Sequence, residues 1–350
     1  MKRVSLRDIA NEVGMHVSTV SLALRNHRKI PETTRVRIAE AAERMNYRPD
    51  PMMSALCAYR QTCRTADYQG TIAWIDTYLT PGPYWYDGYF RGAQARAGKM
   101  GYTIERFWLR EKGMKPSRLN SVLKSRGIQG VLLAPQPITH AHLRLSWEDF
   151  SAVRFGYSLT RPELHMVTSH QFLNTMTCFR RTARMGFKKI GLVLSNWEDE
   201  RVSRCFSGGF AAAQATVPGG DRFPPCLYDS GSDRWDNKEI SEDNPVTQSI
   251  LAWAKKYRPD AIITLSSQLQ AILNRAGFSI TVIYIAIDEE SPDSEKSGII
   301  EQRDEIGAAA MEFVSDMIRR GERGIPKIPR ILMVPGEWRA AGRTKTVKTC

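Results

Sequence analysis

The apolar positions of residues 1–45 recur at the spacing of α-helices. In the first stretch they form one face, made by Leu6, Ile9, Ala10 and Val13. Ser5 and Asp8 form a capping box at the start of this stretch, and Gly14 permits a tight turn at its end. Two further helices are predicted over residues 17–25 and 32–45. Three short helices with a tight turn between the first two are typical of a helix-turn-helix unit.

The second of these helices is the candidate recognition helix, because this element enters the major groove in helix-turn-helix units. Its exposed residues are predicted to be Val17, Ser18, Ser21, Leu22 and Arg25. Hydroxyl groups can bond a phosphate or a base edge, whereas Val17 and Leu22 offer only apolar contact, for example with thymine methyl groups. The predicted DNA-contacting set is completed by Ser5, Thr19 and Thr34. The alternative is a solvated helix face without a ligand.

Residues 49–64 are predicted to be a hinge. Pro49 and Pro51 end the third helix, since proline lacks the backbone donor and disfavours helix in the preceding residue. Residues 52–58 favour helix but are too few to be helical alone. Leu56 is the candidate wedge, because an apolar side chain can enter a minor-groove base step. The alternative is an ordinary linker helix packed on the next domain.

From residue 70 onward, short apolar runs alternate with amphipathic stretches. Strands are predicted over residues 71–75, 102–107, 131–135, 152–156, 189–194, 226–228, 261–265 and 282–287, with helices over 89–101 and 119–125. Alternation of strands and helices predicts doubly wound parallel sheets, here two of them.

Open parallel sheets bind ligands beyond the carboxyl ends of their strands, so residues that follow strands are candidate ligand contacts. They are Asp76, Thr77, Trp197, Ser266, Ser267 and Asp288. Asp288 is a natural acceptor for ligand hydroxyls. Aromatic residues near these ends, Tyr84, Trp85 and Tyr86, can stack on sugars or planar ligands. The alternatives are core packing for the aromatic side chains and a capping or solvated role for Asp288.

Composition sets the protein class. With 350 residues, 42% hydrophobic and 25% charged, the chain is expected to be a soluble protein of two or three domains. It has no apolar run of membrane-spanning length and no signal peptide, so a cytoplasmic location is expected. The six cysteines are scattered without zinc spacing, which predicts free thiols and no metal. Net charge is +13, and residues 1–64 hold twelve Lys/Arg against six Asp/Glu, which suits a polyanionic partner.

Residues 1–60 closely resemble the DNA-binding headpiece of the LacI/GalR family of bacterial transcription regulators. The matching runs are residues 6–10, 13–14, 19–21, 34–35, 46–49 and Leu56. The resemblance implies a homodimer whose two headpieces contact a near-palindromic operator. It also implies a hinge helix that orders on DNA and inserts a leucine. Where the family often has Arg and Asn, this chain has Leu22 and Arg25, so a different operator is expected.

Residues 65–350 resemble the effector domain of the same family, which is similar to periplasmic sugar receptors. The resemblance places Asp288, Ser266 and Gln302 at effector-contacting positions. It also implies two discontinuous lobes, the first at about 65–160 with 291–325 and the second at about 161–290 with 326–350. Three usual polar anchors are replaced, by Phe206, by His170 with Gln171, and by Ser266 with Ser267.

The sequence therefore predicts an all-α helix-turn-helix headpiece at 1–48, a hinge helix at 49–64, and a two-lobed α/β domain like a periplasmic binding protein at 65–350. The predicted function is a dimeric repressor whose affinity for double-stranded operator DNA is set by a small molecule between the lobes, with a carbohydrate among the candidates. The alternative is a regulator that responds to no effector and whose core serves only for dimerisation. No enzyme is predicted, because phosphate-loop, dinucleotide, zinc-protease and nucleophile-elbow motifs are absent from the sequence, and no cofactor is expected.

Overall fold

A computed structural model of the chain describes residues 4–24, 30–45, 47, 68–77, 85–109, 114–229, 244–287 and 296–341. The chain divides into two compact units. The first comprises residues 1–134, 144–153 and 307–328, and the second comprises residues 135–143, 154–306 and 329–350. The predicted hinge at 49–64, with its hinge helix, lies outside the described residues.

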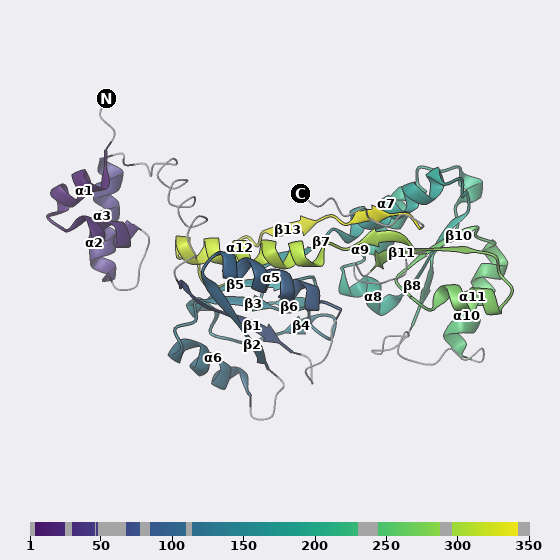
Figure 1. Cartoon of the computed structure of the whole chain (residues 1–350), viewed down its shortest axis with the longest axis horizontal. Helices are drawn as coiled ribbons and strands as arrows, with labels where there is room; N and C mark the ends of the chain where they lie inside the picture. Colours follow the sequence, from purple (N-terminus) through teal and green to yellow (C-terminus); the bar gives the residue numbers. More distant parts are fainter. Residues whose placement is uncertain are drawn as a thin grey trace. The chain divides into compact units, whose positions relative to one another are not determined.

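Three short helices form the N-terminal part of the chain (Figure 1), namely α1 (Leu6–Val13), α2 (Val17–Leu24) and α3 (Glu32–Arg44). They follow the predicted boundaries within one residue. Their core contains Ile9, Val20 and Ile38, none of which is exposed to solvent. Because the apolar residues recur at helical spacing, each helix turns one apolar face towards the other two.

The first sheet has six strands in the order β13-β7-β5-β3-β1-β2. Its strands are β1 (Gly70–Asp76), β2 (Tyr102–Trp108), β3 (Gly130–Leu133), β5 (Ser151–Phe155), β7 (His165–Ser169) and β13 (Ile331–Val334). The pairs β1–β2, β1–β3 and β7–β13 are parallel. In Figure 1, α5 (Asp87–Lys99) and α12 (Arg303–Arg320) lie on one side of this sheet and α6 (Pro116–Ser125) on the other.

The second sheet also has six strands, in the order β14-β12-β11-β10-β8-β9. They are β8 (Ile190–Ser195), β9 (Cys226–Tyr228), β10 (Ala261–Thr264), β11 (Thr281–Ile287), β12 (Ser297–Ile300) and β14 (Glu337–Arg339). The strand β14 runs antiparallel to β12, whereas the other neighbouring pairs of this sheet are parallel. Every residue of β8 and β10 is buried, as expected for parallel strands covered on both faces. The accompanying helices are α7 (Gln171–Arg184), α8 (Asn196–Arg201), α9 (Cys205–Gln214), α10 (Pro245–Tyr257) and α11 (Leu269–Arg275).

Smaller elements join these sheets. The strands β4 (Ala141–His142) and β6 (Leu159–Arg161) form a two-stranded sheet, and η1 (Trp147–Asp149) and η2 (Gly219–Asp221) are single 3₁₀ turns. All eight predicted strands are present, so the two predicted doubly wound sheets are confirmed. Within the described ranges, no helix combines the length and apolar character needed to cross a bilayer.

Candidate nucleic-acid interface

The start of α1 is fixed by a reciprocal cap. The Ser5 hydroxyl accepts the backbone N–H of Asp8 at 3.4 Å, and the Asp8 carboxylate accepts the backbone N–H of Ser5 at 2.7 Å. Gly14 follows the helix with φ of 66°, a left-handed conformation in which its N–H reaches the last carbonyls of α1. The predicted capping box and tight turn are therefore confirmed, and Ser5 holds the helix while remaining exposed.

A histidine caps the start of α2, the candidate recognition helix. His16 occupies the N-cap position of α2, where its Nδ1 accepts the backbone N–H of Ser18 at 3.3 Å. The same nitrogen lies 2.7 Å from the Ser18 hydroxyl. Sequence analysis missed this role. The available signal was position, since a polar residue directly before an apolar-periodic run is a helix-start candidate.

The third helix, α3, packs against both α1 and α2. Ile38 and Ala41 of α3 are fully buried in the headpiece core. The Arg37 guanidinium donates to the carbonyl oxygen of Val13 at 3.2 Å, which ties α3 to the end of α1. The shared core holds α2 against the other two helices, and the Arg37 bond holds α3 to α1.

The predicted DNA-contacting residues differ in accessibility. Ser18 is exposed, while half-buried positions are held by Val17, Thr19, Ser21, Leu22 and Thr34. Val17 packs against the headpiece core, so its side chain is only partly exposed, as are those of Ser21 and Leu22. Ala23 is buried and Leu24 is half-buried, so both contribute to the core face of α2 together with Val20. Arg25 and Leu56 lie outside the described residues.

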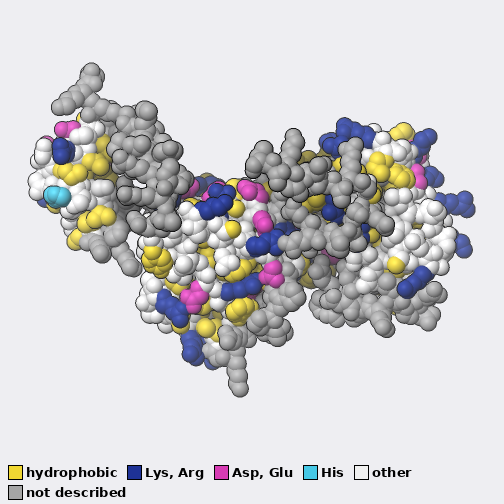
Figure 2. Space-filling view, in the orientation of Figure 1, with side chains coloured by type: hydrophobic (Ala, Val, Ile, Leu, Met, Phe, Trp, Pro, Cys, Tyr) yellow, Lys and Arg dark blue, Asp and Glu magenta, His cyan; other side chains and the backbone are white. Residues whose placement is uncertain are grey.

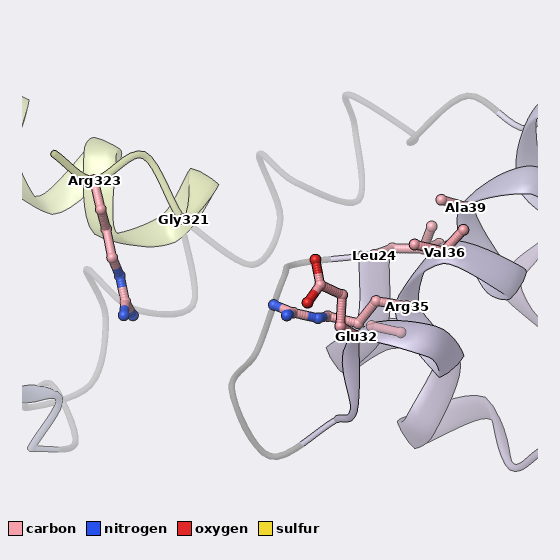
Figure 3. A pocket seen from close by; sticks show the side chains of 8 residues that line it. Leu24, Glu32, Arg35, Val36, Ala39, Gly321 and Arg323 are labelled. Carbon is pink, nitrogen blue, oxygen red and sulfur yellow. The ribbon is translucent and has the colours of Figure 1, made fainter. Parts of the chain in front are cut away.

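One apolar surface of the headpiece had no place in the sequence analysis. Figure 3 labels Leu24 at the end of α2 beside Val36 and Ala39 of α3. Val36 is 51% exposed, and Glu32 and Arg35 flank it. Because Val36 lies away from the core, it is available for contact on the headpiece surface.

In the α/β part of the chain, the carboxylate of the candidate Asp76 already accepts hydrogen bonds from neighbouring side chains. Its fully buried carboxylate accepts the Tyr86 hydroxyl at 2.6 Å, the Trp74 indole N–H at 3.1 Å and the Arg106 Nε–H at 2.8 Å. Arg106 also donates to Asp87 at 2.6 Å. Although burial opposes its charge, the hydrogen bond and charge of Asp87 and those of Asp76 raise the pKa of Arg106.

The candidate aromatic residues of this region are packed together. Trp85 is half-buried and meets Tyr86 and Tyr89 edge-on, with ring centroids 5.5 and 5.7 Å apart. Tyr86 is fully buried. Tyr84 lies outside the described residues. Trp85 is therefore the one described aromatic candidate here with a surface still accessible.

Around α8, Trp197 is half-buried beneath the Arg201 guanidinium, which lies 4.4 Å from the ring centroid. Asp199 of the same helix is fully buried, and its Oδ1 accepts the backbone N–H of Ser207 at 3.0 Å. Its Oδ2 has no hydrogen-bond partner among the described residues. Asp199 is therefore a candidate contact for a polar ligand, because buried polar atoms normally have hydrogen-bond partners.

The remaining candidate ligand contacts differ in burial and in their hydrogen bonds. Ser266 is buried and its hydroxyl accepts the backbone N–H of Gln268 at 3.3 Å, in the turn that precedes α11. Gln302 is half-buried between β12 and α12, and its backbone carbonyl accepts the N–H of Ile306. Asp288 lies outside the described residues.

The three replaced anchor positions have structural roles. His170 caps α7 by accepting the backbone N–H of Leu173 at 3.3 Å, and the Gln171 amide donates to the Thr168 hydroxyl at 3.2 Å. Phe206 is 6% exposed and belongs to the same apolar cluster as Phe210. His170 therefore serves as a helix cap, and Phe206 is a core residue.

Metal-ligating residues and thiols are the remaining reactive side chains of the described structure. Within the described segments, no three His, Cys, Asp or Glu side chains are grouped as metal ligands. The described cysteines Cys178, Cys205 and Cys226 are free thiols. Burial raises the pKa of Cys178, and it raises the pKa of Cys226 to about 11. Such thiols are protonated near neutral pH and therefore weak nucleophiles.

Comparison with known families gives one match, which covers the helical N-terminus. Residues 5–50 match the model described as bacterial regulatory proteins, lacI family. The matched range contains α1, α2 and α3 in full. No curated protein is significantly similar to the chain.

Solved structures extend the likeness beyond the headpiece. A complex of the transcriptional regulator CelR with cellobiose shares 16% identity and a TM-score of 0.53, over 97% of this chain and 100% of that one. The lac repressor dimer bound to operator and the anti-inducer ONPF shares 14% identity and a TM-score of 0.53, over 97% and 98%. A putative transcriptional regulator of the same family from Rhizobium etli shares 15% identity and a TM-score of 0.59, over 78% and 98%. At these identities the likeness shows a common fold.

Proposed function

We propose that this chain, whose residues 5–50 belong to the lacI family of bacterial regulatory proteins, is a repressor that binds a near-palindromic DNA operator as a homodimer. The observation that carries the proposal is the coincidence of the matched range with a folded three-helix unit in which α2 is capped by His16 and packs on the core shared with α1 and α3. A short helix held in this way can present Ser18, Ser21 and Leu22 to base edges. The operator-bound lac repressor, which shares the fold, supports this function.

The experiment is selection from a pool of randomised duplexes with the full chain. A recurring near-palindrome is expected, because two identical headpieces contact two half-sites. Replacing Ser18 and Ser21 by alanine is expected to abolish the enrichment. The matched control is replacement of Ser117 and Ser121 of α6 by alanine, which removes two hydroxyls on a helix far along the chain. Absence of an enriched sequence with the native chain would contradict sequence-specific binding.

Leu56 tests the proposed hinge wedge. Leu56→Ala is expected to weaken operator binding while leaving binding to a scrambled duplex nearly unchanged, because kinking a base step contributes only when the headpieces are in register. Met52→Ala is the control, since it removes a similar apolar volume from the same segment. Equal operator affinities for native chain and Leu56→Ala would refute the wedge.

For regulation, we propose that a small molecule bound in the α/β domain sets the operator affinity, because an effector need only bind one arrangement of the domain better than another. The candidate contacts are Tyr84, Trp85, Trp197, Ser266, Asp288 and Gln302, and carbohydrates are the first class to test, supported by the cellobiose complex of CelR. A ligand that raises the melting temperature and shifts operator affinity is expected. Asp288→Ala should remove both effects and spare operator binding.

A second candidate, a regulator that responds to no effector, is favoured by a specific observation. The side chains of Asp76, His170 and Ser266 each accept a hydrogen bond from another group of the protein, and Phe206 packs in the core. A panel of sugars that shifts neither melting temperature nor operator affinity would support this candidate.

A further inference from the structure

The parallel strands of the second sheet all begin at one edge. The backbone N–H of Asp260 donates to the carbonyl of Lys189 at 2.9 Å, and that of Thr281 donates to the carbonyl of Asp260 at 3.2 Å. Residues directly before β8, β10 and β11 are therefore neighbours. The backbone N–H of Lys188 donates to the Asp260 carboxylate at 2.9 Å, which places Lys188 at the same edge.

The helices of this sheet end where its strands begin, since each connects the end of one strand to the start of the next. Residues of the last turns of α7, α10 and α11 therefore meet the residues before the strands. The Arg222 guanidinium belongs here too, because it donates to the carbonyls of Ala215 and Val217 just after α9.

Exposed cations crowd this edge, which we call the basic edge. Its members are Arg180, Arg181, Arg184, Lys188, Lys189, Arg222, Lys255, Lys256, Arg258 and Arg275, every one of them exposed. The carboxylates among these residues are those of Asp221 and Asp260, which are half-buried. Over the region that Figure 1 labels β10, α10 and α11, dark-blue Lys and Arg side chains outnumber magenta ones in Figure 2.

The net charge of the basic edge exceeds that of the whole chain outside residues 1–64. Ten cations and two carboxylates give the basic edge +8, whereas residues 65–350 carry +7 in total. Two segments outside the described residues adjoin β12 and β14 in sequence. Residues 288–295 hold five acids and residues 342–350 hold three Lys/Arg. The described cations therefore outweigh them.

Helix dipoles explain only part of the arrangement. Cations near helix carboxyl ends are stabilising, which covers Arg181, Arg184, Lys255 and Arg275. Lys188, Lys189 and Arg258 lie in turns outside the helices. Like charges held close together repel and lower stability, so folding alone gives no reason for this many.

We propose that the basic edge is a second DNA-contacting surface, which binds the phosphate backbone of duplex DNA without regard to sequence. Lys and Arg side chains on an exposed surface with little apolar area suit phosphate contacts, whereas a protein partner would need an apolar centre. Met185 is the one large apolar side chain near these cations among the exposed hydrophobic residues of the described structure. The surface lies in the second unit and the headpiece lies in the first.

The test compares two triple variants that lose the same charge. K188Q/K189Q/K255Q removes three lysines of the basic edge, and K99Q/K115Q/K327Q removes three exposed lysines of the first unit. Affinity of the full chain for a labelled scrambled duplex is measured by fluorescence anisotropy at about 50 to 200 mM salt. For the basic-edge variant, binding is expected to be roughly fivefold or more weaker, with a salt slope shallower by about 1 to 3. The control should stay within about twofold of the native chain, since lysines outside the basic edge are not expected to contact phosphates.

Equal behaviour of the two variants would overturn the proposal. The preference for an operator over the scrambled duplex should be unchanged in the basic-edge variant, because phosphate contacts carry no base information. This separates the proposal from a failure of the headpiece. A melting temperature equal to or above that of the native chain is also expected, since a purely stabilising role would lower it. Unaltered duplex binding with lost retention on polyglutamate would replace DNA by an acidic protein partner and so refute the proposal.

Discussion

His16 holds Ser18 at the first turn of α2, with its Nδ1 3.3 Å from the backbone nitrogen and 2.7 Å from the hydroxyl of Ser18. The residue proposed to contact DNA is thereby attached to the residue that starts the helix. The helix has only eight residues, so its first turn is a large part of the surface available to a groove.

His16→Ala is expected to weaken operator binding by the full chain roughly three- to tenfold, because losing an N-cap costs about 1 kcal/mol and frees the Ser18 side chain. His16→Asn should restore most of the affinity, since asparagine is a good N-cap acceptor. Hydrogen exchange at the amides of Ser18 and Thr19 provides the second measurement. If alanine and asparagine variants bind alike, capping is not what links His16 to DNA binding.

Asp76 is expected to be a stability residue. Asp76→Ala removes the buried acceptor of the Arg106 Nε–H, the Tyr86 hydroxyl and the Trp74 indole, and should lower the free energy of unfolding by about 3 kcal/mol. Asp87→Ala is the matched control, because Asp87 bonds the same guanidinium but its side chain is 36% exposed. Its expected cost is below about 1 kcal/mol. Urea unfolding followed by circular dichroism would distinguish the two, and similar losses would contradict the argument.

The contrast between Asp76 and β1 shows what sequence could and could not predict. The strand was predictable because residues 71–75 form an apolar run bounded by turn residues. The environment of Asp76 was not, because Arg106 is brought to it by the register of β1 and β2, which pairs Trp74 with Arg106. Sequence reasoning placed Asp76 at a ligand-binding edge, whereas the structure supplies its donors from within the fold.

Two of the strands that sequence analysis missed, β12 and β13, are short and give ambiguous signals. β13 is an apolar run of only four residues that is mostly exposed in the structure, and β12 begins with Ser297 and Gly298, so neither shows the period of a strand. Their strand conformation depends on partners far away in sequence, since β13 pairs with β7 and β12 with β11. The headpiece, by contrast, folds from local patterns, and its three helices were predicted nearly to the residue.

Thiol reactivity provides a pH-dependent prediction. A thiol reacts as its thiolate, and burial raises the pKa of Cys226 to about 11 and also raises that of Cys178. Below a raised pKa the group stays protonated, so at pH 8 both should react with iodoacetamide about a hundredfold or more slowly than free cysteine. In strong urea, where burial is lost, rates should become ordinary. Mass spectrometry of the cysteine peptides gives both rates, and equal native and unfolded rates would contradict the burial argument.

Close packing of α5 against α12 depends on Gly307. A Cβ on this residue would lie 1.9 Å from the backbone oxygen of Tyr89, so Gly307→Ala must push the two helices apart. The expected loss is about 3 kcal/mol in the free energy of unfolding. Gly98 of α5 is the control, since a Cβ there meets nothing within 4 Å, and Gly98→Ala should stabilise by about 0.5 to 1 kcal/mol through its helix propensity. Both free energies come from urea unfolding of the full chain. If Gly307→Ala proves as benign as Gly98→Ala, the helices tolerate separation and the glycine is not needed for their contact.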